Sequence, residues 1–220
     1  MELRWRPTSQ TPRFVLLLAA MFLEILLAPV IYASPVGLAG ARTVTGLMLI
    51  AALAAIGARR TAIVLFALVA GAHVLEIVHP QPQIQILGAA VRLVFLVYVF
   101  LAVIRHVLRE RNVTYDTLAG AACGYMLIGM IFGDLLQMTE LLQPGSYSIP
   151  ASMALGPPRD SRAALLYFSF VTLTTVGYGD VLPTNPGAGG IAVSEGIVGQ
   201  LYLAVTVARL VGLHLAGRSE

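Results

Sequence analysis

The most distinctive chemistry of this sequence lies in a run of five residues, 175–179, that reads Thr-Val-Gly-Tyr-Gly. None of the five is acidic, so the oxygens it can offer to a cation are backbone carbonyls and the Thr175 hydroxyl. Carbonyls that all point one way require alternating unusual dihedrals, which Gly177 and Gly179 adopt without steric cost. The side chains of Val176 and Tyr178 would then point away from the ion path and support it. Stacked carbonyls of this kind can replace the hydration shell of a cation.

This run, continued by Asp180, closely resembles the selectivity filter of the potassium-channel family. The resemblance covers about residues 112–215, and within it the sequence looks like small bacterial six-helix members. It implies K⁺ as the permeant ion, bound by the carbonyls of residues 175–178, and a homotetramer whose four chains complete each oxygen ring. A sodium or calcium channel is expected to carry a carboxylate ring here. A non-selective relative is expected to replace Tyr178 with an acid.

The same resemblance suggests residues that support the filter. Tyr167 stands where many relatives have a tryptophan, and we expect its hydroxyl to bond Asp180. Phe168 replaces a second tryptophan and cannot donate a hydrogen bond, which leaves Thr172 as a partner for the Tyr178 hydroxyl.

A short apolar stretch, 160–173, precedes the filter and is too short to span a bilayer. We predict a re-entrant pore helix that begins at Asp160 or Ser161, either of which is a good N-cap. Its C-terminal dipole end, near Leu173, would face the ion path and favour a cation.

Composition places the chain in the membrane class. Of its 220 residues, 58% are hydrophobic and 11% are charged, with a mean hydropathy of +0.84. All 14 basic residues are arginines scattered around apolar runs, which argues against nucleic-acid binding. The single cysteine, Cys123, is expected to be a small buried residue. Six apolar segments qualify as spanning helices: 14–33, 36–57, 61–78, 84–104, 117–138 and 187–215.

The arginines predict the orientation. They cluster before the first segment, between the second and third, and after the fourth, which places those loops and both termini on the cytoplasmic side of the cell membrane. The first segment could instead be a signal peptide, but its apolar run is longer than a typical signal core and contains Glu24, which favours a retained helix.

The segments suggest two modules, a four-helix sensor-like domain (1–105) and a pore domain (112–220). A voltage sensor needs several arginines in its fourth helix, whereas 84–104 contains only Arg92. We therefore expect little intrinsic voltage sensing. No nucleotide- or calcium-binding cytoplasmic domain is expected in this chain, and the expected partners are membrane lipids and three further copies.

The last segment is expected to carry the gate. By resemblance, Gly199 occupies a hinge position, although it could equally be a close-packing glycine against the fifth segment, which carries two Gly-xxx-Gly spacings. Glu195 either bonds behind the filter or faces the ion cavity as a charge. The resemblance assigns three apolar residues to the cavity: Leu203, Val207 and Val211.

One buried ion pair is also predicted. Glu24 and Arg92 are expected at similar depths in the first and fourth segments, and an unpaired charge there is costly. Arg42 competes for Glu24, and a protonated Glu24 is the alternative.

Two other functions are considered. A potassium-uptake subunit has four degenerate filter loops in one polypeptide, whereas this chain has one complete loop. A non-conducting membrane scaffold would have no reason to retain the whole filter.

Overall fold

Helices dominate the part of the chain that the structure describes. The structure, a computed structural model, describes residues 13–32, 37–57, 60–79, 81–110, 112–153 and 161–216. These residues form seven helices and a two-stranded ribbon, in the order α1 (Arg13–Tyr32), α2 (Gly37–Ile56), α3 (Arg60–Val78), α4 (Pro82–Arg109), α5 (Tyr115–Leu142), β1 (Tyr147–Ser148), α6 (Arg162–Leu173), β2 (Leu182–Pro183) and α7 (Pro186–Ala216).

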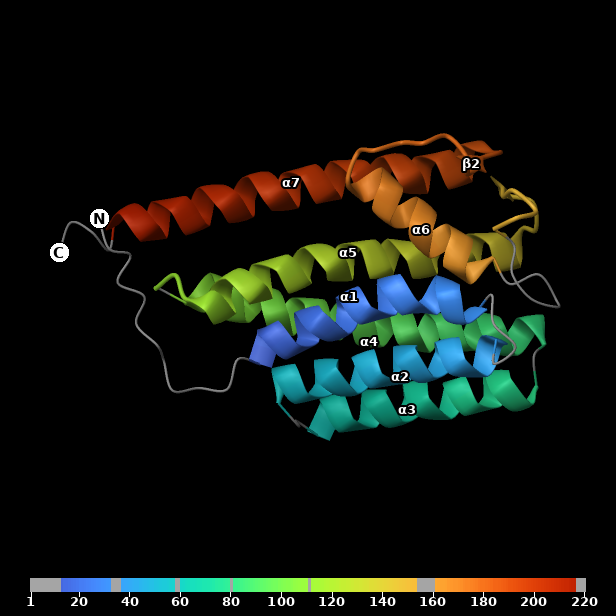
Figure 1. Cartoon of the computed structure of the whole chain (residues 1–220), viewed down its shortest axis with the longest axis horizontal. Helices are drawn as coiled ribbons and strands as arrows, with labels where there is room; N and C mark the ends of the chain where they lie inside the picture. Colours follow the sequence, from blue (N-terminus) through green and yellow to red (C-terminus); the bar gives the residue numbers. More distant parts are fainter. Residues whose placement is uncertain are drawn as a thin grey trace.

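The long helices lie side by side with α5 at the centre of the packing, where it contacts α1, α4, α6 and α7 (Figure 1). The α2 and α3 helices lie along one edge of the bundle, and α7 lies along the opposite edge. The short α6 slants between α5 and α7. The chain after it turns back to β2, which lies at the same end of the bundle as the start of α6. This is the course that the sequence predicts for a re-entrant pore loop.

The α4 and α5 helices form an antiparallel pair joined by a short polar link. Pro82 stands in the first turn of α4, where its missing N–H costs no hydrogen bond. Thr114 caps α5: its hydroxyl accepts from the backbone N–H of Thr117 at 3.1 Å. Asp116, in the first turn of α5, accepts from the backbone N–H of Phe14 at 3.0 Å and ties α1 to α5.

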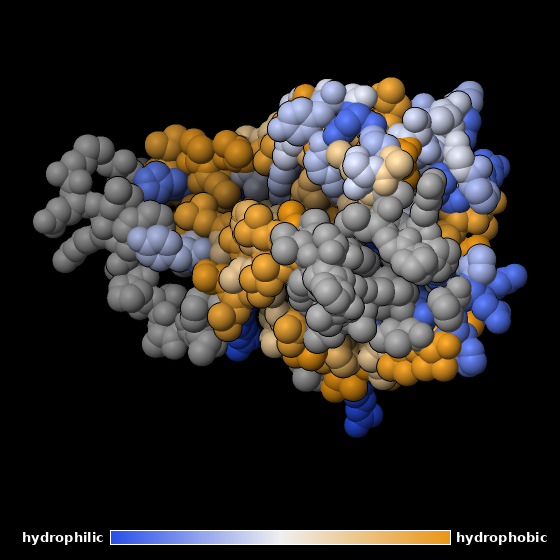
Figure 2. Space-filling model, turned by 45° about the vertical axis from the view of Figure 1, so that its right-hand side comes forward, coloured by the Kyte–Doolittle hydropathy of each residue, from blue (hydrophilic) through white to orange (hydrophobic). Residues whose placement is uncertain are grey.

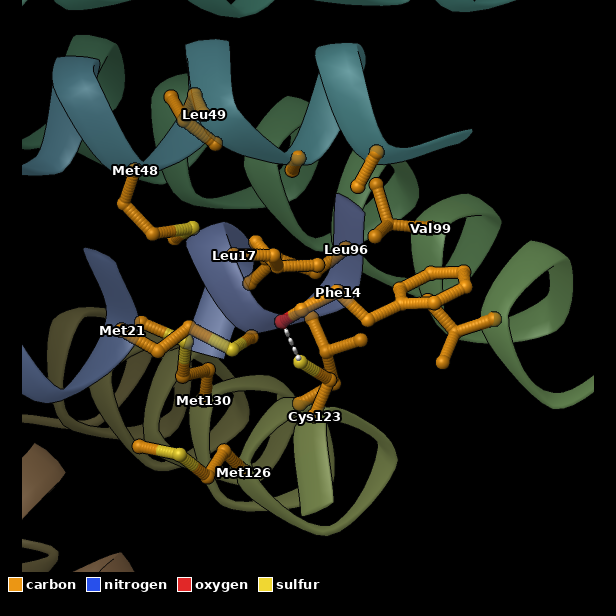
Figure 3. Packing of buried hydrophobic residues seen from close by; sticks show 14 of the residues in the cluster. Phe14, Leu17, Met21, Met48, Leu49, Leu96, Val99, Cys123, Met126 and Met130 are labelled. Carbon is orange, nitrogen blue, oxygen red and sulfur yellow. Dashed lines mark hydrogen bonds between the residues drawn. The ribbon is translucent and has the colours of Figure 1, made fainter. Parts of the chain in front are cut away.

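The main apolar core crosses the predicted boundary between the two modules. Figure 3 shows α1 side chains such as Leu17 and Met21 between Met48 of α2 and Met130 of α5. Cys123, fully buried as predicted, donates its thiol hydrogen to the carbonyl of Phe14 at 3.3 Å. The first four helices therefore pack directly against α5, in the second predicted module of their own chain.

Three of the described helices, α4, α5 and α7, are long and apolar enough to cross a membrane. The α1, α2 and α3 helices have 20, 20 and 19 residues and match the three remaining predicted segments, so their spanning stays a prediction. Apolar side chains cover much of the helical flanks, while polar ones gather toward the end that carries β2 (Figure 2). The protein is an all-α membrane protein apart from its short ribbon.

The β-ribbon fixes the segment that follows the filter. Tyr147 of β1 pairs with Pro183 of β2 in antiparallel register. The Glu140 carboxylate accepts from the backbone N–H groups of Gly145 and Tyr147, at 2.9 and 3.1 Å. Asn185 then caps the start of α7 by accepting from the N–H of Ala188 at 2.9 Å.

Candidate ion-conduction site

The filter segment has the alternating backbone that the sequence predicts. Gly177 and Gly179 adopt positive φ angles of 58° and 76°, and Thr175, which was not predicted to do so, adopts φ 60°. Because every second residue lies in the left-handed region, successive carbonyls can turn toward one side of the strand. Such conformations persist in non-glycine residues only where surrounding contacts hold them.

Backbone hydrogen bonds to the end of α6 provide such contacts. The N–H groups of Val176 and Gly177 both reach the Val171 carbonyl, at 3.0 and 3.4 Å. The N–H of Thr175 donates to the Thr172 carbonyl at 3.0 Å. The filter thus continues directly from the pore helix, and its innermost turn is held by backbone hydrogen bonds that need no side chain.

The outer filter is braced by the predicted tyrosine–aspartate contact. The Tyr167 hydroxyl donates to Asp180 Oδ2 at 2.7 Å, and Asp180 Oδ1 accepts from the N–H of Val181 at 2.9 Å. This hydrogen bond lowers the pKa of the Asp180 carboxyl and raises the pKa of Tyr167 to about 12. The Tyr167 ring also stacks on Tyr178, with centroids 6.5 Å apart. Within one described chain, no hydrogen bond joins the side chains of Thr172 and Tyr178.

The side chains of Val176 and Tyr178 line a cavity of about 310 Å³ that also borders α6, α1 and α2. They therefore point behind the filter strand, as the sequence predicts. Both remain more than half exposed in a single chain, at 52% and 70%. A single chain therefore covers only part of the side chains behind its own filter strand.

The pore helix has one of the two predicted N-cap residues, Ser161, and α6 begins at the next residue, Arg162. Ser161 occupies the N-cap position but makes no side-chain cap hydrogen bond, and Asp160 lies outside the described residues. At the other end, the Leu173 carbonyl accepts from the Tyr125 hydroxyl at 2.9 Å. The C-terminus of α6 thus lies near the middle of α5 and beside the filter, where the helix dipole favours a cation.

Gly199 is a buried packing position inside a continuous α7. A Cβ atom there would lie 2.4 Å from Leu173 Cδ1, which is closer than side chains tolerate. The tight contact is with α6, not with the fifth segment as the packing alternative predicted. The glycines of the Gly-xxx-Gly spacings in α5 pack against other neighbours. Gly129 and Gly133 allow α6 to approach closely, and Gly124 leaves room for the Tyr202 side chain of α7. The α7 helix continues through Gly199 without a break, and a hinge at this residue stays a prediction.

The three predicted cavity residues share one face of α7. Leu203, Val207 and Val211 recur every four residues and are 37%, 55% and 52% exposed in one chain. The opposite side is held by Tyr202, whose hydroxyl donates to the Ala121 carbonyl at 2.7 Å. Packing thus fixes which face of α7 is left for an ion path or for neighbouring chains.

Glu195 lies on the packed side of α7 and is fully buried. Its Oε1 lies 2.5 Å from the Ser169 hydroxyl of α6, and that hydroxyl also lies 2.6 Å from the Gly129 carbonyl of α5. Of the two placements that the sequence left open, the structure has the hydrogen-bonded one behind the filter and not the cavity-facing charge.

The predicted ion pair between Glu24 and Arg92 is wrong. Arg92, only 3% exposed, bonds Asp134 of α5 through two nitrogens, with its shortest contacts at 2.8 Å. Its guanidinium also donates to Gln137 at 3.1 Å and lies 3.9 Å from Glu76. The α4 arginine therefore joins the first four helices to α5.

Helix ends explain the error. The apolar pattern placed the ends of the fourth and fifth segments at 84 and 138, whereas α4 begins at Pro82 and α5 continues to Leu142. At 1.5 Å per residue, Arg92 and Asp134 lie about 15 and 12 Å from neighbouring helix ends. Glu24 instead accepts from the Thr45 hydroxyl at 2.8 Å. The side chain of its predicted competitor, Arg42, lies outside the described residues.

Residues that the sequence analysis missed connect the helices around the filter. Asp134 and Tyr125 are polar residues in an apolar segment, which is a signal for a buried partner. Arg209 is a third such residue. Its Nη2 donates to the carbonyls of Leu108 and Glu110, which ties the end of α7 to the α4–α5 link. No sequence pattern pointed to that contact.

Comparison with known families identifies the region built around this loop. Residues 146–213, from β1 to near the end of α7, match a family model described as "Ion channel". The stretch that holds α6, the filter strand and most of α7 is therefore similar to an ion-channel pore region, and this match indicates ion conduction and not an enzyme activity. Searches of curated proteins and of solved structures found no match to the chain.

Proposed function

We propose that the channel is a homotetrameric, potassium-selective pore with little intrinsic voltage sensing. The observation that carries the proposal is the alternating backbone of the filter strand, with positive φ at Thr175, Gly177 and Gly179. Four such strands around one axis would offer stacked rings of carbonyl oxygens, which is the coordination that a dehydrated K⁺ requires.

The uncovered surfaces of one chain support the tetramer. Tyr178 and Val176 are largely exposed behind the filter, as are the apolar residues along one face of α7. Three further copies would cover the first two and enclose the α7 face around a watery cavity. An apolar cavity lining can close by dewetting without full occlusion, which makes Leu203, Val207 and Val211 the proposed gate.

The orientation is part of the proposal. The starts of α1, α3 and α5 and the ends of α2, α4 and α7 lie toward one end of the bundle in Figure 1. Arginine-rich loops are retained on the cytoplasmic side, which would place this end inside the cell and the β-ribbon outside.

Liposome reconstitution tests the function. The purified channel should carry K⁺ but little Na⁺ across the membrane, and its mass in detergent should be that of four chains. Tyr178→Asp should reduce the preference for K⁺, because it introduces carboxylates at the outer filter. Equal K⁺ and Na⁺ fluxes in the unmodified protein, or a conducting monomer, would overturn the proposal.

A further inference from the structure

The hydroxyl of Ser169 is placed between two oxygens that both act as acceptors when Glu195 is ionised. It lies 2.6 Å from the Gly129 carbonyl oxygen and 2.5 Å from Glu195 Oε1. Both distances fall in the range of O–H···O hydrogen bonds, about 2.5–3.0 Å. Each of these two short contacts therefore needs its own hydrogen.

Counting hydrogens identifies the second donor. A serine hydroxyl supplies one hydrogen, and a backbone carbonyl supplies none. If Ser169 donates to Gly129, the hydrogen between Ser169 and Glu195 must come from the carboxyl group. If Ser169 donates to Glu195, two lone-pair oxygens face each other at 2.6 Å, which is repulsive. One hydrogen shared between both acceptors would be too bent for two short bonds.

The surroundings of Glu195 favour the neutral form on independent grounds. The side chain is fully buried, and its Oε2 has no hydrogen-bond partner. A buried ion without a partner is far more costly than a buried neutral carboxylic acid. The titratable groups that face it are phenols, Tyr125 of α5 and Tyr147 of β1, and no cation pairs with it among the described residues.

We infer that Glu195 is a protonated positioning residue, which donates to Ser169 while Ser169 donates to Gly129, so that one hydrogen-bond chain joins α7, α6 and α5. The close approach is possible because Gly129 has no side chain: a Cβ there would lie 2.8 Å from the Phe170 ring. The chain holds the back of the pore helix, four residues before its end at Leu173, and thereby the base of the filter.

Loss of this proton would reverse one bond of the chain and break the other. An ionised Glu195 can only accept, so Ser169 would turn its hydrogen to the carboxylate and no longer donate to the Gly129 carbonyl, which removes the link between α6 and α5. The new charge would also be drawn toward water, which moves α7 away from α6. Conduction should therefore be maintained while Glu195 is neutral and lost in alkaline solution.

Infrared spectroscopy of the full-length reconstituted channel tests the protonation directly. Glu195→Gln keeps an amide donor for Ser169 and cannot ionise, and Glu110→Gln makes the same chemical change at a half-exposed site, where the side chain is 42% exposed. A protonated-carboxyl C=O band present in the unmodified channel at neutral pH should be missing in Glu195→Gln and retained in Glu110→Gln. Spectra that do not differ in this band would overturn the inference.

The K⁺ flux then tests the consequence and rests on the proposed function. The unmodified channel and Glu110→Gln should lose flux as pH rises, whereas Glu195→Gln should conduct across the same range. An identical alkaline loss in Glu195→Gln would overturn the positioning role. If no variant carries K⁺, the proposed function fails, while the infrared band still decides the protonation state.

Ser169→Ala provides a second variant in case Glu195→Gln does not fold. It removes the acceptor but not the proton, so the carboxyl C=O band should shift to higher frequency as the hydrogen bond is lost. An unshifted band would show that Ser169 is not the partner and would overturn the chain.

Discussion

Removing the positive charge of Arg92 is expected to destabilise the fold by about 3–5 kcal/mol, the usual cost of leaving one member of a buried ion pair alone. Arg92 and Asp134 are only 3% and 5% exposed, and three hydrogen bonds of 2.8–3.0 Å join them. Arg92→Gln would leave the Asp134 carboxylate, and nearby Glu76, without the guanidinium that compensates them. Arg105→Gln is the matched control, because Arg105 is exposed near the end of the same helix.

Unfolding in mixed detergent micelles, followed by circular dichroism, measures this cost. Asp134→Leu should be about as destabilising as Arg92→Gln, because it leaves the buried Arg92 guanidinium without its carboxylate partner. The double variant Arg92→Met/Asp134→Leu should be more stable than the sum of the single changes predicts, by about 2–3 kcal/mol, since no buried charge of this pair remains.

The same double-mutant cycle separates this pair from the one that the sequence suggested. Glu24 and Arg92 line one small cavity together but share no ion pair in the described structure. Their coupling energy should therefore be well below that of Arg92 and Asp134. A larger coupling for Glu24, or a loss in Arg92→Gln no greater than in Arg105→Gln, would refute the assignment.

Three further outcomes are expected. Tyr167→Phe removes the hydroxyl that braces the outer filter. It should lower the K⁺ flux by the same factor at every pH between about 5 and 10. The Tyr167 brace is present above the lowered pKa of Asp180, is lost only as pH falls through it, and persists up to about 12, the pKa of Tyr167. Gly199→Ala should lower thermal stability by about 1–3 kcal/mol through its clash with Leu173, whereas Gly196→Ala, which meets no atom within 4 Å in one chain, should not; equal effects would contradict the packing role. Open probability should vary shallowly with voltage, and a curve that needs about ten or more charges per tetramer would contradict a fixed α4 arginine.

Local chemistry explains why the filter could be predicted from sequence. The backbone angles at Gly177 and Gly179 follow from residue type, and the contact between Tyr167 and Asp180 followed from the family resemblance. The left-handed φ at Thr175 could not be predicted from its own type, because it depends on hydrogen bonds to the end of α6.

Contacts between helices explain what the sequence left undecided. Hydropathy places each helix to within a few residues, but at 1.5 Å per residue an error of four residues at the end of α5 was enough to hide Asp134 as the partner of Arg92. It also cannot give the rotation of a helix that is apolar all around. Only packing therefore determined that Gly199 faces Leu173, and that Glu195 faces Ser169.

The sequence by itself thus determined the membrane class, the helical segments and the filter strand, because these depend on residue type and on neighbours along the chain. The tertiary structure decided which buried polar groups pair and which glycines admit which helix. Those pairings depend on the depth and rotation of each helix against its neighbours, and a buried polar group bonds whichever partner that geometry brings within reach.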